Sequence, residues 1–586
     1  MGENIDPTWL AFSGATTLEE ADVDARLRRV ERHYGALVDY PLTTRRAVGG
    51  RSGLAIVGDA DPRSRWPHFS EAADLAIATA HLPGGWSRLL DGSSGDAGLR
   101  LARAVAEDPD RVIATLSAPV AIAVLDRRSG GMWLVNDALG AARVFSLEVG
   151  GLTMWSNRPG ALALFAGVRP RADERGWRIL AAAGWLLADA SPMAGVRRLR
   201  PGTVVTVSPS GEVRRRESGA IGALVRPQGT MAELAPLAAQ QMTAQAREAA
   251  RMWPETADVD LSGGRDSRVV AAAVAAAGID ARYRTSDATP GEAGIARRLV
   301  ELAPAALEHR VGRRRPGSAS PGTPLLERAR NLHRLHDGVR HPQKLRGKMT
   351  LPRPRPERPK FSGHGGEIAH GFFYKSRGEI RRLRGPRRRL TRRVMRFFTQ
   401  GHDAALAESA SAAEAVVEQT LDEGRELGLR GPALLDWFYL VDRFAHRSGI
   451  ATDSERTALF AAPAVIAASF ALKPRERVAA RLHDELISRF VPEWGEVPYF
   501  KPTRARAARI RRERLWEVDG DAAVVGEILA AGGSWTETYD REQALAMWSE
   551  ARAGRAQPKW ESLFEGIVYR ATFDQHLDEL GRAATG

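Results

Sequence analysis

The stretch that decides the fold is Asp260-Leu261-Ser262-Gly263-Gly264-Arg265-Asp266-Ser267-Arg268. It follows a short apolar run, ADVDL (257–261), and leads into an Ala/Val-rich run, RVVAAAVAAAG (268–278). This pattern predicts a strand, a glycine-rich turn and a helix. Two adjacent glycines let the backbone approach a ligand closely, and the amide groups of such a turn and of the helix N-terminus bind phosphate oxygens. We therefore expect a phosphate cradle at this turn.

Three polar side chains of the turn suit the same ligand. Ser262 and Ser267 add hydroxyl donors, whereas Asp266 alone would repel a phosphate. An acidic residue fits here when Mg²⁺ lies between the carboxylate and the phosphates. The Walker pattern, in which Gly-Lys-Ser/Thr follows a glycine after four residues, occurs nowhere in the chain. The simpler alternative is an ordinary glycine-rich turn between a strand and a helix.

Composition narrows the chemistry further. The 586 residues, 44% of them hydrophobic, are enough for two large domains. An excess of 85 Lys and Arg over 71 Asp and Glu gives a net charge of +14, which favours anionic partners such as nucleotide, pyrophosphate, acidic peptide or RNA. The chain has no cysteine, which excludes disulfides, Cys-ligated zinc, iron–sulfur clusters and thiol nucleophiles. We expect a cytoplasmic protein without a membrane partner, because the apolar runs are short and the N-terminus lacks a secretory signal pattern.

Residues 1–225 are predicted to form a layered α+β domain. Short β-branched and aromatic runs, punctuated by Gly, Asp and Ser, indicate hairpins between residues 50 and 165. Turns are expected at Ser129-Gly130-Gly131 and at Ser210-Gly211. Residues 226–586 change character, since a long helical run (231–253) is followed by alternating strands and helices, which predicts a parallel sheet. The chain from about 430 to 585 reads as mostly helical.

Two basic segments interrupt this pattern. Residues 310–360 are rich in Pro and Arg, and residues 375–397 carry a dense Arg run. The simpler interpretation is a solvated or mobile insertion. The alternative is a basic lid over an anionic reactant.

SGGRDS resembles the SGGxDS pyrophosphate-binding loop of the N-type ATP pyrophosphatases. These enzymes cleave ATP between the α and β phosphates, adenylate a carboxyl or carbonyl group and let an amine displace AMP. The loop does not choose among the members of that family. The rest of the chain is similar, in order, to asparagine synthetase and its relatives. The stretch 120–157 looks like the later strands of a class II glutamine amidotransferase domain, GVRRLRPGTVVTV (195–207) like the stretch before the synthetase domain, SGHGGE (362–367) like SGEGxDE, and VPEWGEVPYFKP (491–502) like the stretch that carries a catalytic lysine.

This resemblance implies an N-terminal amidotransferase-like (Ntn-type) sandwich and an α/β pyrophosphatase-loop synthetase domain with a parallel sheet and a helical C-terminal part. The family's glutaminase uses an N-terminal cysteine, whereas residue 2 here is Gly and TWLAFSG (8–14) takes the place of the opening strand. We therefore expect a degenerate amidotransferase domain, with the amine supplied by the substrate. β-Lactam synthetase and the lasso peptide cyclases share this pattern, and RYRTSDATPGEAGIARRLVELAP (282–304) looks most like the cyclases.

A lasso cyclase adenylates an Asp or Glu side chain of a core peptide and joins it to the N-terminal amine as a macrolactam. The resemblance implies ATP and Mg²⁺ as cofactors, a precursor peptide as substrate, and a leader peptidase and a leader-binding protein as partners. The alternative is a β-lactam-type or ammonia-dependent ligase acting on a small molecule. A tRNA-modifying enzyme ranks low, so nucleic acid is not the expected partner, and a non-catalytic binding protein with a degenerate loop disagrees with the intact Asp266 and glycines.

The resemblance also implies residue roles. Asp266 and Glu367 would hold Mg²⁺, although the family usually has Asp at both positions. The residues expected to bind the nucleotide are Val259, Leu261, Ser262, Gly263, Gly264, Ser267, Thr285, Gly363 and Gly365. Of these, Val259, Leu261 and Thr285 could equally be core residues.

Four residues are candidates for catalysis. Lys501 would offset charge on the α-phosphate, or it is a surface lysine. His364 stands where β-lactam synthetase has the Tyr of a base dyad, and an imidazole with an ordinary pKa near 6.5 could deprotonate an attacking ammonium, although a lone His is often structural. By spacing, Asp442 is its first candidate partner and Glu455 its second.

Overall fold

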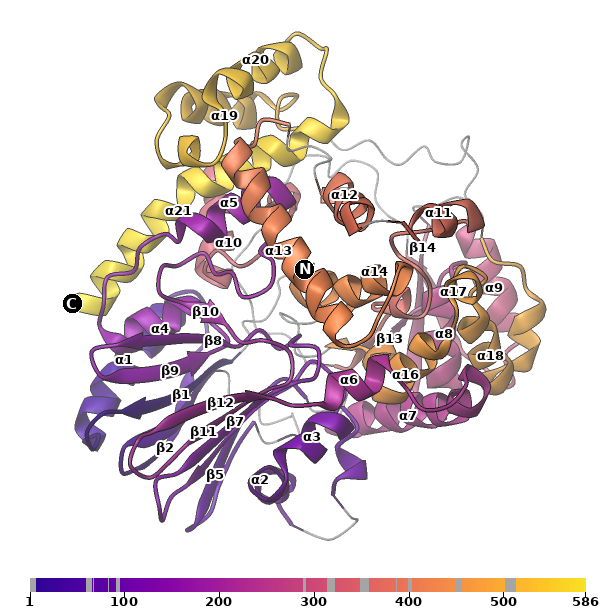
Figure 1. Ribbon diagram of the computed structural model, residues 1–586, viewed down its shortest axis with the longest axis horizontal. Helices are drawn as coiled ribbons and strands as arrows, with labels where there is room; N and C mark the ends of the chain where they lie inside the picture. The colour runs from indigo at the N-terminus through magenta and orange to yellow at the C-terminus, as the bar shows by residue number, and fades with distance from the viewer. Residues whose placement is uncertain are drawn as a thin grey trace.

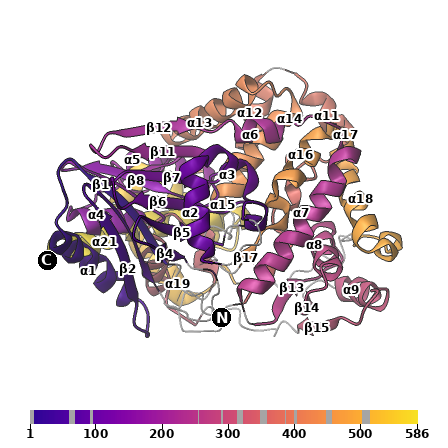
Figure 2. The same ribbon diagram turned by 90° about the horizontal axis from the view of Figure 1, so that it is seen from below.

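The computed structural model describes residues 7–58, 66, 68–82, 84–90, 95–253, 255–287, 291–312, 322–347, 358–385, 387–398, 403–447, 456–500 and 513–586 (Figure 1). We call the part up to Val225 the N-terminal half and the part from Met231 on the C-terminal half. The division at 225/226 into two domains stays a prediction. Figure 2 shows the antiparallel sheets of the first half to one side and the parallel strands of the second half to the other.

Two antiparallel six-stranded sheets form the N-terminal half. In spatial order, the first contains β10 (Arg197–Arg198), β8 (Phe145–Val149), β9 (Leu152–Ser156), β1 (Thr8–Gly14), β3 (Ser52–Gly58) and β2 (Thr43–Gly49). The second contains β12 (Val213–Glu217), β11 (Thr203–Val207), β7 (Met132–Asn136), β6 (Ala121–Asp126), β5 (Leu75–Ala80) and β4 (Phe69–Glu71). The predicted hairpin turns are confirmed, since Gly130 and Gly211 adopt positive φ angles of 76° and 85° between paired strands.

The two sheets pack face to face, because alternate residues of each strand point to opposite sides. Trp9 and Ala11 of β1 join a core cluster with Leu134 of the second sheet, whereas Leu10 and Phe12 lie in a different cluster with helix α1 (Glu20–Gly35). Helix α4 (Pro159–Ala166) packs on the same outer face. Helices α2 (Ala97–Glu107) and α3 (Pro109–Thr115) cover the second sheet. The predicted layered α+β architecture is confirmed as a helix–sheet–sheet–helix sandwich.

The C-terminal half is built on a five-stranded parallel sheet. Its spatial order is β15 (Glu308–Gly312), β14 (Ala281–Ser286), β13 (Ala257–Asp260), β16 (Lys360–Phe361) and β17 (Arg456–Thr457). The helices that follow its first two strands in sequence are α8 (Arg265–Ala276) and α9 (Glu292–Glu301). Residues 269–274 of α8 are fully buried, because Ala and Val let the helix lie close to the sheet. The predicted parallel sheet is confirmed.

Helices make up most of the rest. They are α5 (Glu174–Ala183), α6 (Ala220–Val225), α7 (Met231–Met252), α10 (Leu325–His336), α11 (Arg377–Arg382), α12 (Arg387–Phe398), α13 (Ala407–Glu426), α14 (Pro432–Phe438), α15 (Ala445–Arg447), α16 (Pro463–Ala471), α17 (Pro474–Val478), α18 (Arg481–Phe490), α19 (Asp519–Ala531), α20 (Arg541–Arg552) and α21 (Glu561–Thr585), with a π-helix, η4 (Tyr439–Phe444), and a 3₁₀ turn, η7 (Pro492–Glu496). The last helix returns to the N-terminal half, where Phe573 lies 4.8 Å from the ring of Trp177 (Figure 1).

The described parts of the two basic segments contain helices. The first, 310–360, includes α10, and the second, 375–397, includes α11 and most of α12. Leu390, Val394 and Phe398 recur every four residues along α12 and are buried, whereas the arginines lie between them. These helices are packed through a sparse period of apolar residues, which the arginines between them obscure in the sequence. That the two segments are insertions stays a prediction. Residues 313–321 and 348–357 lie outside the described part.

Candidate functional site

Two glycine-containing loops leave the carboxyl ends of neighbouring parallel strands. The first, residues 261–264, connects β13 to α8, and the second, residues 362–366, follows β16, which pairs with β13. From β13 the chain moves outward through β14 to β15, whereas β16 and β17 lie on the other side of β13. The strand order therefore reverses between β13 and β16. In open α/β sheets, ligands bind at such a switch point, outside the carboxyl ends of the strands.

The first loop is organised by its own serines. The Ser262 and Ser267 hydroxyls are hydrogen-bonded at 2.7 Å, and Ser262 Oγ accepts from the Gly264 N–H at 3.1 Å. Gly264 is the N-cap of α8, so the positive end of a 12-residue helix starts at this point. The loop therefore brings two serine hydroxyls, two glycines and a helix N-terminus to one point.

The two loops touch through glycine. A β-carbon at Gly366 would lie 2.2 Å from Cγ of Asp266, and one at Gly363 would lie 2.4 Å from the Ser267 nitrogen. Real β-carbons do not come this close to other atoms, so only glycine permits this approach. As a result, SGGRDS and SGHGGE form one site.

Asp266 is held by two histidines that the sequence analysis did not identify. The Nε2 of His483, from α18, lies 2.8 Å from Asp266 Oδ1, and that of His370 lies 3.5 Å from the same oxygen. Burial raises the pKa of Asp266, but the hydrogen bonds and electrostatic attraction of the two histidines outweigh it and lower the pKa well below its ordinary value. The carboxylate is therefore ionised at physiological pH.

Glu367 lies at the same corner. Its Oε2 accepts a hydrogen bond of 2.8 Å from the Tyr439 hydroxyl. A further cation, Lys375, donates to Gly371 O at 2.8 Å, and burial lowers its pKa while Glu367 and Asp266 oppose the shift electrostatically. Lys375 was also missed by sequence reasoning, because it lies in the basic segment interpreted as an insertion. The site thus combines two carboxylates with a nearby ammonium group.

His364 lies next to Phe444, with ring centroids 5.4 Å apart. Burial lowers its pKa to about 4, against the attraction of Glu367. This is a correction to the expected value near 6.5: the imidazole is neutral at physiological pH. A neutral ring can accept a proton, but it is a weaker base than the sequence implied.

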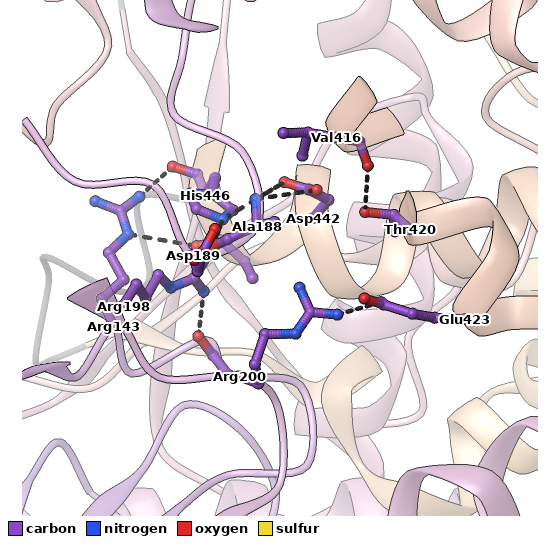
Figure 3. A network of polar contacts seen from close by, with 12 residues as sticks. Arg143, Ala188, Asp189, Arg198, Arg200, Val416, Thr420, Glu423, Asp442 and His446 are labelled. Atoms are coloured by element: carbon purple, nitrogen blue, oxygen red, sulfur yellow. Dashed lines mark hydrogen bonds and ion pairs between the residues drawn. The ribbon is translucent and has the colours of Figure 1, made fainter. Parts of the chain in front are cut away.

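Asp442 is 1% exposed and faces the N-terminal half (Figure 3). Its carboxylate accepts from the Ala188 N–H at 3.3 and 3.4 Å and lies 3.5 Å from Nε2 of His446. Burial raises its pKa to about 7, and Arg198 opposes that shift. These contacts with the other half are not what a proton-transfer partner of His364 would show.

The remaining nucleotide-binding candidates lie around the loops. Val259, Leu261 and Thr285 are buried, and Thr285 Oγ1 donates to Leu261 O at 2.7 Å. This places all three in the support beneath the first loop. Gly365 adopts a φ of 84°, which an L-residue rarely adopts.

The segment that precedes Lys501 reaches the site. Phe500 donates its N–H to Gly263 O at 2.8 Å. Arg268, absent from the predicted set, holds the same segment by donating to the carbonyls of Trp494 (3.3 Å), Val497 and Pro498 (3.1 Å). Its position directly after SGGRDS in the sequence is the signal that could have identified Arg268 as a site residue. Lys501 and Glu455 themselves lie outside the described residues.

The site offers oxygen ligands to a hard cation. Asp266 and Glu367 are carboxylates on touching loops, and Mg²⁺ is commonly held by one or two carboxylates with phosphate and water completing its shell. In the part of the chain that the structure describes, no group of three or more His, Cys, Asp or Glu is placed to hold a metal ion. The residues present therefore fit a magnesium–nucleotide complex rather than an all-protein metal cage.

Among the described residues, no helix is both long and apolar enough to cross a lipid bilayer.

No protein-family model matches the chain, and no curated protein matches it. Among solved structures, the allosteric regulatory enzyme of purine biosynthesis is similar with 12% identity and a TM-score of 0.26, over 54% of this chain and 82% of that one. Glutamine phosphoribosylpyrophosphate amidotransferase from B. subtilis, complexed with ADP and GMP, is similar with 12% identity and a TM-score of 0.23, over 54% and 83%. TM-scores this low do not support a functional inference, so we infer the function from the geometry of the chain itself.

Proposed function

We propose that this protein is an ATP-dependent, AMP-forming amide ligase. The observation that carries the proposal is the contact of two glycine loops at the strand switch point, which brings Asp266 and Glu367 to one corner beside the N-terminus of α8. A phosphate-binding turn with carboxylates beside it suits a metal–nucleotide complex.

In this proposal each loop residue has a defined task. The amides of Gly263 and Gly264, with the Ser262 and Ser267 hydroxyls, bind the pyrophosphate part of ATP. Asp266 and Glu367 hold Mg²⁺, which neutralises phosphate charge when it is bound. His370 and His483 keep the Asp266 carboxylate oriented and ionised. Lys375 adds a positive charge close to both carboxylates.

The chemistry proceeds in two steps. A substrate carboxylate oxygen attacks the α-phosphorus of ATP, the bond from that phosphorus to the bridging oxygen breaks, and pyrophosphate leaves. A neutral amine then attacks the acyl carbon of the adenylate and AMP leaves. The proton lost by the amine passes to a base, for which neutral His364 is the candidate beside Glu367.

The absence of cysteine bears on where the attacking amine comes from. The 586 residues contain no thiol that could release ammonia from glutamine by the family's mechanism. An amine within the substrate meets this requirement, since holding both groups in attack geometry supplies up to roughly 7–11 kcal/mol of the barrier reduction. We therefore propose an acidic peptide as substrate, closed to a macrolactam between an Asp or Glu side chain and its N-terminal amine, as in the lasso peptide cyclases.

The test uses the full chain with ATP, Mg²⁺ and synthetic peptides that have a free N-terminus and one internal Asp or Glu. AMP release, together with a peptide mass lowered by one water, supports the proposal. The matched control is the N-acetylated peptide, which can be adenylated but cannot close. AMP formation with aspartate and ammonium, and none with any peptide, would instead support the small-molecule ligase. Nucleotide cleavage to ADP would refute the adenylation step.

A further inference from the structure

The π-helix η4 connects the two halves of the molecule. Tyr439 at its start donates to Glu367, and Phe444 at its end packs on His364. Between them in sequence, Asp442 accepts from the Ala188 N–H of the N-terminal half. π-Helical turns are rare and occur frequently at functional sites. One short element therefore touches both the candidate site and the N-terminal half.

The N-terminal half grips this element with two residues in left-handed backbone conformations. Ala188 has a φ of 48° and Arg143 a φ of 52°, and both are nearly buried. Arg143 donates to the carbonyls of Ala445 (3.4 Å) and His446, directly after the π-helix. Figure 3 shows Arg143, Arg198 and Ala188 converging on His446 and Asp442 from the other half.

The backbone strain at these two positions needs support from the contacts. A non-glycine residue in the left-handed region is strained, and it persists where surrounding interactions over-determine it. Here the N–H of Ala188 is bound by Asp442, and its carbonyl lies 3.1 Å from Nε2 of His446. The left-handed turn and the π-helix thus stabilise each other across the seam between the halves.

Asp442 lies among buried basic groups of the N-terminal half. Asp442 is buried near Arg198 and Arg200, and Arg198 is itself buried against His446 and the Gly140 carbonyl. Replacing Asp442 with alanine would leave the buried Ala188 N–H without its acceptor, which is destabilising locally. The next residue, Arg443, stacks on Phe372, with its guanidinium carbon 3.9 Å from the ring centroid, and attracts Glu367 electrostatically.

We propose that the N-terminal half, through Ala188 and Arg143, holds η4 in the register at which Tyr439 orients Glu367. Asp442 and Tyr439 are then positioning residues of the metal–nucleotide site. This inference rests on the proposed function for what Glu367 binds. It gives the N-terminal half a structural role in the site.

The first experiment follows hydrogen–deuterium exchange of the ligand-free full chain. Asp442→Ala is expected to raise exchange in 439–446 and also in 362–368, the loop that carries Glu367. Asp442→Asn keeps an acceptor for the Ala188 N–H and is expected to restore most of the protection in 362–368. If Asp442→Ala leaves exchange in 362–368 at the wild-type level, the coupling is refuted, whatever nucleotide binding shows.

The second experiment measures binding of Mg²⁺ with α,β-methylene-ATP by calorimetry. Tyr439→Phe removes the hydroxyl that holds Glu367 and is expected to weaken binding about 10- to 100-fold, as loss of an outer-shell partner does. The matched control is Tyr34→Phe, which removes a buried tyrosine–carboxylate bond of 3.0 Å to Asp337 that involves no residue of the π-helix. Equal affinity of the two variants would overturn the role of Tyr439. A wild type that binds no nucleotide would refute the proposed function, while the exchange result still decides the coupling.

Discussion

Gly366→Ala is the substitution that tests the contact between the two loops. The added methyl would lie 2.2 Å from Cγ and 2.4 Å from Cβ of Asp266, so these atoms would have to separate by about 1.2 Å to reach an ordinary 3.4 Å contact. Cβ is fixed to the backbone of α8, and Oδ1 is bonded to His483 at 2.8 Å, so the shift cannot be absorbed by rotating a flexible side-chain end.

The expected result is a loss of stability and of nucleotide binding together. Overpacking of this kind costs about 1–3 kcal/mol of the free energy of unfolding. Displacing a carboxylate that holds Mg²⁺ removes an interaction of about 1.5–3 kcal/mol, which corresponds to a roughly 10- to 100-fold larger dissociation constant. Urea unfolding measures the first quantity, and calorimetric titration with Mg²⁺ and α,β-methylene-ATP measures the second.

Gly294→Ala provides the matched control. Gly294 lies inside α9, and a β-carbon there would meet no atom within 4 Å. Alanine in a helix is favoured over glycine by about 0.5–1 kcal/mol, so this variant should be slightly more stable and bind the analogue normally. If Gly366→Ala matched wild type in both measurements, the loops would not touch as described and the site would have to be assigned elsewhere.

Two further substitutions probe the site. Because burial lowers the pKa of His364 to about 4, the unfolded chain takes up a proton there between pH 6.5 and 4 while the folded chain does not, so wild type should lose about 2 kcal/mol of unfolding free energy relative to His364→Gln between pH 8 and pH 5. Chemical denaturation at both pH values measures this, and an unchanged difference would contradict the pKa shift. Arg268→Met deprives three carbonyls in 494–498 of a donor and should cost about 2–4 kcal/mol, with faster hydrogen exchange in 494–500. Exchange unchanged there would show that Arg268 does not hold the segment.

Regular elements were predictable where local pattern and tertiary packing agree. The strand predicted at 257–261 is β13 (Ala257–Asp260), and the helix predicted over 231–253 is α7, which starts after a Thr230–Glu233 capping box. α12 escaped prediction because arginines separate its buried residues. β16 is two residues long and follows a Pro/Arg-rich stretch, so its place beside β13 depends on pairing that no local pattern encodes.

The candidate site was predictable only in part, for a similar reason. SGGRDS and SGHGGE could be recognised from local sequence alone, because phosphate-binding turns need glycine and hydroxyl residues close together in sequence. His483 contacts Asp266 from 217 positions away and stands in an ordinary amphipathic helix. Asp442 looked like a base partner by spacing, yet its contacts run to Ala188 in the other half. Such contacts follow from the tertiary arrangement, which spacing does not contain.

The most direct test of the central claim is a crystal structure of the full chain with Mg²⁺ and α,β-methylene-ATP. The account predicts the β and γ phosphates on the amides of Gly263 and Gly264, and the metal bound at about 2.1 Å by carboxylate oxygens of Asp266 and Glu367. A nucleotide bound away from these two loops, or a metal ligated by neither carboxylate, would contradict it.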